Sequence, residues 1–165
     1  MAFKSYEEWL SGVPSRISGD PLWEFETYRR ASFLADLVWF DAEKLLHDPR
    51  GRGIAWQIVD SAGSVAANIE EGYGRGFGKD YARFLRIALG SARETKGWYF
   101  RARHVFDDQV IHHRLGLIDD DREIRDLLAR YLERQHFRVT AVRDAREARR
   151  LWPTMSFQMV ILDLM

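Results

Sequence analysis

The stretch EGYGRGFGKDYARFLRIALGSARETKGWYFRARH, residues 71–104, holds the turn and the helical pattern that decide the fold. Glycines occupy the alternate positions 72, 74, 76 and 78, and Lys79 follows directly. This spacing matches neither a P-loop, G-x-x-x-x-G-K-[ST], nor the dinucleotide fingerprint G-x-G-x-x-G after a strand. Because glycine accepts the positive φ of a helix C-cap, the spacing predicts a corner between two helices.

Helical periodicity extends on both sides of this corner. Apolar residues recur at three- and four-residue steps over 52–71, after the corner, and over an upstream stretch that begins at Asp20–Pro21, an N-cap followed by proline. Short connections predict antiparallel neighbours. The three expected apolar stripes are Ile54, Ile58, Ala62, Val65 and Ile69; Tyr81, Phe84, Ala88, Ala92, Thr95, Tyr99 and Ala102; and Phe25, Tyr28, Ser32, Ala35, Trp39, Ala42 and Leu46.

Small residues cluster on two of these helices, as SAGSVAA at 61–67 and ALGSA at 88–92, so we expect the two segments to touch. Before the first long helix, Ser5 and Glu8 have capping-box spacing, which predicts a short helix followed by a linker over 11–21. The aromatic side chains Trp23, Phe33 and Phe40 exceed what one narrow stripe can bury, which predicts self-association.

Composition indicates a globular chain of 165 residues, with 46% hydrophobic and 13% aromatic residues. The formal net charge is zero, so only local charge can indicate a nucleic-acid partner. Cysteine is absent, which excludes disulfides and cysteine-based zinc sites. We see no signal peptide and no run of about 20 apolar residues, so we expect a cytoplasmic protein with no membrane partner.

The pattern changes after Gly116. LGLI at 115–118 is a short apolar run, REIRDLLARYLERQ is helical, FRVTAV is β-rich, DAREARRLW is helical and FQMVILDLM resembles a strand. Strand–helix–strand–helix–strand is typical of a parallel α/β sheet.

Two family resemblances divide the chain. Residues 20–118 resemble the four-helix-bundle family encoded in ribosomal-RNA intervening sequences, which includes the accessory variability determinant of diversity-generating retroelements. The resemblance rests on DPLWEFETYRRASFLADLVW, SVAANIEEGYGRG, YARFLRIALGSARETKGWYFRARHVF and HHRLGLID. It implies an up-down four-helix bundle, a ring-like homo-oligomer, and RNA or a reverse-transcriptase complex as partner.

Residues 117–165 look like the first half of a response-regulator receiver domain, on LGLIDDDREIRDLLARYLERQHFRVTAVRDAREARRLW and MVILDLM. The resemblance implies that Asp119, Asp120 and Asp163 hold Mg²⁺ and that Asp163 accepts a phosphoryl group from a histidine kinase. Only strands one to three of the receiver are represented.

The two resemblances overlap at LGLI, which would be helix in one and strand in the other. We favour a fourth helix continuing through DREIRDLLARYLERQ, because it completes the bundle. The expected fold is therefore mainly α: a short helix and linker at 1–19, a bundle at 20–135 and an incomplete flavodoxin-like α/β fragment at 117–165. Such a chain resembles a fusion, or a truncated, chimeric reading frame.

Two groups of side chains are candidate sites. Basic residues outnumber acidic ones between 72 and 104, with aromatic residues among them, which predicts nucleic-acid binding. These basic residues are Arg75, Lys79, Arg83, Arg86, Arg93, Lys96, Arg101 and Arg103. The spacing of Ser64, Asn68 and Glu71, facing Glu94, predicts a buried polar network, with plain surface exposure as the alternative.

No catalytic arrangement of Ser, His and Asp or of paired carboxylates is visible, so we expect no enzyme and no cofactor for the bundle. The first functional hypothesis is an oligomeric RNA- or ribonucleoprotein-binding adaptor. The alternative is a phosphorelay protein that uses Asp163, and Mg²⁺ belongs only to that alternative.

Overall fold

The computed structural model describes residues 3, 5–76, 78–118, 133, 138–140, 142 and 145–154. The chain divides into two compact units, Met1–Leu128 and Ala129–Met165. Each unit is described by itself.

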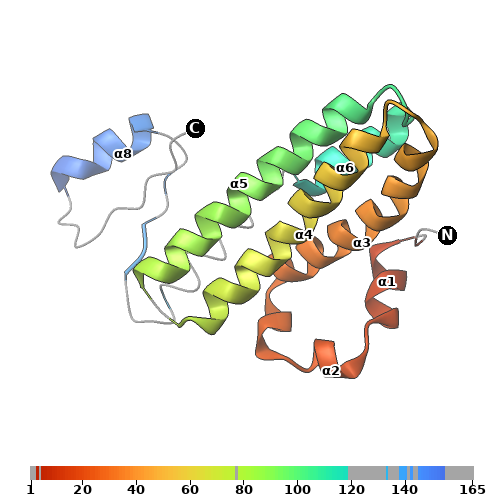
Figure 1. Ribbon diagram of the computed structural model, residues 1–165. Coiled ribbons are helices and arrows are strands. Elements are labelled where there is room, and N and C mark those ends of the chain that lie inside the picture. The colour runs from red at the N-terminus through yellow and green to blue at the C-terminus, as the bar shows by residue number, and fades with distance from the viewer. Residues whose placement is uncertain are drawn as a thin grey trace. The chain divides into compact units, whose positions relative to one another are not determined.

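The first unit is a helical bundle built on three long helices (Figure 1). α4 lies along α5 in antiparallel orientation, α3 packs along α4, and α6 packs against α5 and α3. In chain order the elements are α1 (Tyr6–Gly12), α2 (Ser15–Ser18), the 3-10 helix η1 (Pro21–Glu24), α3 (Glu26–His47), α4 (Arg52–Gly74), α5 (Lys79–Ala102) and α6 (Asp108–Ile118).

The glycine stretch forms the predicted corner between α4 and α5. Gly76 and Gly78 have positive φ values of 76° and 101°, which side chains other than glycine rarely adopt. A Cβ at Gly72 would lie only 3.0 Å from the Cβ of Phe84 and 3.2 Å from the ring of Tyr81. The corner therefore needs glycine both for its backbone and for the close approach of the two helices.

The stripes of α4 and α5 were predicted nearly correctly. On α4, the buried residues include the predicted Ile58, Ala62, Val65 and Ile69. On α5, all predicted stripe residues are buried except Phe84, and its neighbour Leu85 is buried instead. α4 and α5 pack closely beside these segments: the hydroxyl of Thr95, three residues after the second segment, donates a buried 3.0 Å hydrogen bond to that of Ser61, the first residue of the other.

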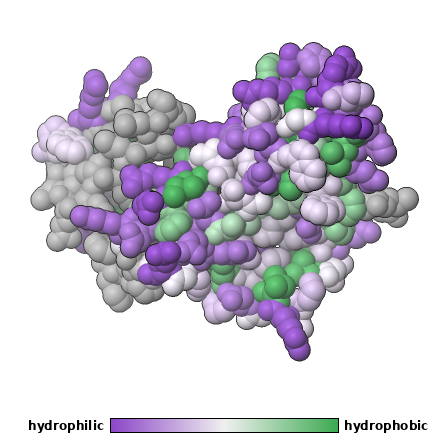
Figure 2. Space-filling model, in the orientation of Figure 1, coloured by the Kyte–Doolittle hydropathy of each residue, from purple (hydrophilic) through white to green (hydrophobic). Residues whose placement is uncertain are grey.

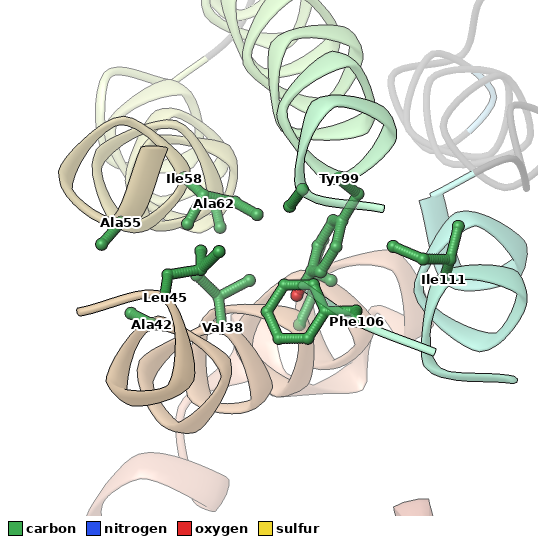
Figure 3. Close-up of a cluster of buried hydrophobic side chains, with 11 residues drawn as sticks. Val38, Ala42, Leu45, Ala55, Ile58, Ala62, Tyr99, Phe106 and Ile111 are labelled. Atoms are coloured by element: carbon green, nitrogen blue, oxygen red, sulfur yellow. The ribbon is translucent and has the colours of Figure 1, made fainter. Parts of the chain in front are cut away.

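One core cluster joins all four bundle helices (Figure 3). Its side chains point toward one another from α3, α4 and α5, and the rings of Tyr99 and Phe106 close it towards α6. Burying a large apolar side chain stabilises the fold by about 1.5–3 kcal/mol. The cluster comprises Leu34, Val38, Ala42, Leu45, Ala55, Ile58, Ala62, Tyr99, Ala102, Phe106 and Ile111.

The prediction for α3 was wrong in its start and in most of its stripe. Asp20 caps the 3-10 helix η1, accepting a 2.8 Å hydrogen bond from the Leu22 amide, and α3 begins only at Glu26. The buried stripe is shifted by one residue and runs through Ala31, Leu34, Val38 and Leu45. α3 carries apolar residues on two adjacent faces, so periodicity did not decide which face the core would take. The face not taken leaves Trp39 70% and Leu46 39% exposed.

The N-terminal segment covers the aromatic excess of α3. Ser5 accepts a 3.2 Å hydrogen bond from the Glu8 amide, which confirms the predicted cap of α1. The Trp9 ring of α1 lies 5.3 Å from Phe33 and 5.8 Å from Trp23 between ring centroids. Trp23 and Phe33 are therefore buried within one copy, and they give no reason for self-association. The expected linker over 11–21 includes helical turns, α2 and the start of η1.

The described residues beyond 118 contain helix and no strand. α8 (Ala145–Leu151) lies within the predicted helix DAREARRLW, and a 3-10 helix, η2 (Trp152–Thr154), follows. In FRVTAV, residues 138–140 and 142 are not strand, so the expected α/β character is not found there. LGLI forms the last turn of α6, as favoured above. The predicted strand FQMVILDLM and all but one residue of the helix continuing through 122–135 lie outside the described residues.

Candidate nucleic-acid interface

Most basic residues of α5 lie on the side of the helix opposite its buried stripe, whereas Lys96 borders that stripe, next to the buried Thr95. Lys79, Arg83, Arg86 and Arg93 follow one another at steps of four, three and seven residues, which keeps them on one face. Figure 2 shows hydrophilic side chains over most of the visible face, with hydrophobic ones in small separate groups. All eight predicted basic residues are exposed: Arg75, Lys79, Arg83, Arg86, Arg93, Lys96, Arg101 and Arg103.

Aromatic rings hold several of these guanidinium groups. Arg75 and Arg83 lie over the ring of Phe84, at 5.3 and 5.6 Å from its centroid. Arg101 and Arg103 lie over the rings of Trp98 and Phe100, at 4.7 and 4.1 Å. A guanidinium stacked on a ring is attracted by the ring face. Arg75 also donates to Glu71, and Arg103 donates to the Phe100 carbonyl. The face therefore combines positive charge with restricted side-chain freedom.

The predicted polar network is not formed. Asn68 donates a 2.7 Å hydrogen bond to the carbonyl of Ser64 in its own helix. Glu71 is exposed and accepts a 2.6 Å hydrogen bond from Nε of Arg75, and Glu94 is exposed and accepts a 3.2 Å bond from Trp98 Nε1. Each carboxylate finds a partner one turn along its own helix, so neither needs a partner across the bundle.

A different polar cluster, missed from the sequence, ties α6 to the bundle. Arg114 of α6 donates from Nε and Nη2 to the two carboxylate oxygens of Asp41 on α3, at 2.8 and 3.2 Å. The Tyr99 hydroxyl of α5 donates to Asp41 at 2.8 Å. All three residues are buried. One carboxylate therefore links α3, α5 and α6.

The electrostatics of this cluster follow from burial and from the Asp41 charge. Burial, then the charge of Asp41 and the hydrogen bond to it, raise the pKa of Tyr99 far above its ordinary value. Burial lowers the pKa of Arg114, but hydrogen bonding to Asp41 and its charge outweigh this effect and raise it overall. Next to Arg114, the pKa of His113 is lowered by burial and by the guanidinium charge. Arg114 and Tyr99 thus keep their protons, and the cluster stabilises the packing of α6 against α3 and α5.

Comparison with known proteins assigns the bundle. The family model of the 23S rRNA-intervening sequence protein matches residues 24–109. The chain belongs to this family. The bundle of the family thus extends from η1 to the start of α6 and includes the whole basic face of α5.

A second family model, the response regulator receiver domain, matches residues 115–165. The chain is 49% identical to Protein PetR of Rhodobacter capsulatus over 51 aligned residues. These residues make up 31% of this chain and 22% of PetR. The chain thus spans about a fifth of the length of that relative. No solved structure matches the chain.

The receiver match and the bundle share residues. Leu115 and Ile118, in the first residues of the receiver match, are helical in α6 and pack against the bundle core. Asp119, Asp120 and Asp163, the Mg²⁺ and phosphoacceptor residues implied by the resemblance, lie outside the described residues. Among the described residues there is no group of three or more side chains suited to a metal ion. In that same part of the chain, no helix is long and apolar enough to span a membrane.

Proposed function

We propose that this protein is a non-enzymatic adaptor that binds RNA through the outward face of α5. The observation that carries the proposal is the segregation of charge. Residues 72–104 hold eight basic side chains against two acidic ones, a local net charge of +6 in a chain whose net charge is zero. Basic faces of this kind bind the phosphate backbone largely without sequence preference.

Aromatic side chains on the same helix support single-stranded RNA as the ligand. Phe100 is 58% exposed, and Trp98, on a different side of α5, lies under the guanidinium of Arg101. Bases stack on exposed rings, and each stacked base contributes about 1–3 kcal/mol in proteins that bind single strands.

The test is RNA binding as a function of salt. R83E/R86E/R93E is expected to abolish binding and to keep the helical content. Each single variant, R83E, R86E or R93E, is expected to flatten the slope of log K against log[salt] by about 0.7–0.9, because it loses one phosphate contact. R16E/R50E/R52E is the matched control, because it makes the same charge change at three exposed arginines that do not belong to α5. Binding that ignores salt, or that is lost equally in the control, contradicts the proposal.

The second candidate function is phosphoryl transfer to Asp163, which the receiver match and the identity to PetR favour. Receiver chemistry requires the carboxylates at 119 and 120 to be held beside Asp163. The helical state of 115–118 does not favour that arrangement, because a receiver needs its first strand there. We therefore place this function second.

A further inference from the structure

A cavity of about 290 Å³ lies between the N-terminal segment and α3. Its wall comes from α1, the turn that follows it, α2, η1 and α3, and none of the described residues that line it belongs to α5. In Figure 1 the N-terminal elements form a loop at one side of α3. The lining includes Phe3, Trp9, Val13, Ile17, Trp23 and Asp36.

Most of this wall is apolar. Trp9 and Trp23 are only 4% and 9% exposed, and their ring centroids lie 5.8 Å apart, so packing fixes both rings. Ile17 of α2 is 49% exposed at the same cavity. A ligand with an alkyl group would remove this side chain from water, which is favourable. The wall therefore suits an apolar group.

One carboxylate stands at the apolar wall. Asp36 lines the cavity together with Ser32, which lies one turn earlier on the same side of α3. Its Oδ2 accepts a 2.7 Å hydrogen bond from Nε1 of Trp9, which fixes the orientation of the carboxylate. Within the described part of the chain, Trp9 is the one hydrogen-bond partner of Asp36, and no arginine or lysine pairs with it. The charge is thus oriented, and no described cation neutralises it.

This combination selects the ligand by charge and by shape. A cationic group can form a charge-assisted hydrogen bond with Asp36, whereas the carboxylate repels an anion such as a phosphate. A guanidinium pairs best with two carboxylate oxygens, but Oδ2 already holds the indole N–H, and an ammonium can use Oδ1 alone. The cavity lies at the lower end of the range of ligand pockets, about 300–1,000 Å³, so the bound group is small.

We propose that this cavity binds a primary alkylammonium group. The ammonium pairs with Asp36, and the alkyl chain lies along Ile17 and Trp23. The group can belong to a free amine or to a lysine side chain, because both present the same charge on the same kind of chain. The site is separate from the proposed RNA-binding face, since it uses no arginine of α5.

Titration of the full-length, ¹⁵N-labelled chain with n-butylammonium chloride tests the site. The NMR signal of the Trp9 indole N–H is expected to shift in a saturable way, because its acceptor carboxylate gains a second partner. Butanol has the same alkyl group without the charge, and butyrate has the opposite charge. Neither is expected to produce a saturable shift, and binding of either one as tight as that of n-butylammonium would overturn the selection by charge.

Two variants each remove one part of the site. D36N removes the charge and keeps an amide oxygen that can accept from Trp9, so the fold is retained. Its affinity for n-butylammonium is expected to fall about tenfold, because a hydrogen bond to a charged group is lost. I17S is expected to reduce the preference for n-butylammonium over methylammonium, because it shortens the apolar wall.

Matched controls make the same changes at exposed residues that do not line the cavity. D60N on α4 and I87S on α5 are expected to bind n-butylammonium as the parent chain does. An affinity that is unchanged in D36N, or that falls equally in D60N, would overturn the role of Asp36. Equal chain-length preference in I17S and the parent chain would overturn the placement of the alkyl group.

A tripeptide distinguishes the two sources of the group. Acetyl-Gly-Lys-Gly-amide presents the same ammonium on a butyl chain, and acetylation of its Nζ removes the charge. Tighter binding of the peptide than of n-butylammonium, lost on acetylation, assigns the site to a lysine of a protein partner. Equal or weaker binding of the peptide assigns it to a free amine. If neither probe produces a saturable shift, the proposal is wrong.

Discussion

Replacing Arg114 with methionine removes one half of the buried ion pair that ties α6 to α3. The side chains of Arg114 and Asp41 are only 9% and 11% exposed, and the pair is bidentate, at 2.8 and 3.2 Å. The substitution leaves the Asp41 carboxylate buried with Tyr99 as its remaining donor in this cluster. Breaking a buried pair in this way costs about 3–5 kcal/mol, because one charge stays buried without compensation.

Urea denaturation followed by circular dichroism measures this cost. With a slope of about 1.5–3 kcal/mol/M, the midpoint is expected to fall by about 1–3 M. R50M, at an arginine whose side chain is 85% exposed, is the control and is expected to leave the midpoint in place. Because R114M alone could prevent folding, D41L/Y99F/R114M is measured beside it.

The triple variant distinguishes the cost of leaving the Asp41 charge unpaired from the cost of losing the packing of the Arg114 side chain. Replacing a whole buried ionic cluster with apolar residues of similar volume is often neutral or stabilising, by up to about 4 kcal/mol. The triple variant is therefore expected to be more stable than R114M. A triple variant as unstable as R114M, or an R114M midpoint equal to that of the parent chain, would refute the reasoning.

Three further predictions follow from the described structure. G90A is expected to raise the free energy of unfolding of the monomer by about 1 kcal/mol, because alanine is the better helix former and its methyl group meets no neighbour; a lower urea midpoint would contradict this. The lowered pKa of His113 means that the folded state binds this proton less tightly than the unfolded state does. The free energy of unfolding is therefore highest above the usual histidine pKa of 6.5 and decreases as the pH falls below it. In urea titrations over a series of pH values, H113Q is expected to remove this decrease. Identical pH profiles of H113Q and the parent chain would argue against the role of His113. Finally, beryllofluoride with Mg²⁺ is expected to produce no spectral change and a small phosphodonor no labelled Asp163; a stoichiometric adduct that D163N abolishes would instead support the phosphorelay.

Much of the bundle could be predicted from the sequence because α4 and α5 each carry a single apolar stripe. Glycine spacing, periodicity and small residues all indicated the same antiparallel pair, and the structure contains it. The exposure of the α5 arginines also followed from periodicity, since they lie opposite that stripe. The aromatic rings that hold them are neighbours within the same helix or at the corner.

Elsewhere, contacts between distant residues decided the outcome. α3 has two apolar faces, and only the packing of its neighbours selects the one that is buried. Asp41 and Arg114 are 73 residues apart, and nothing local pairs them. The available signal was a charged residue within an otherwise apolar stretch of each helix, and a buried charge requires a partner. The predicted network of Ser64, Asn68, Glu71 and Glu94 is not formed because local contacts decide there: Glu71 and Glu94 each have a hydrogen-bond partner one turn away.

The helical state of residues 115–118 has a consequence for how the two sequence families can be separated. The receiver match begins one residue after Arg114, inside a helix and not in a linker. A cut at that boundary would remove Leu115 and Ile118, which are partly buried and pack against the bundle core. The bundle thus takes its last helical turn from receiver-like sequence, so the junction is a shared structural part. A fragment that ends at residue 118 is expected to keep the fourth helix, whereas one that ends at 114 loses its final turn.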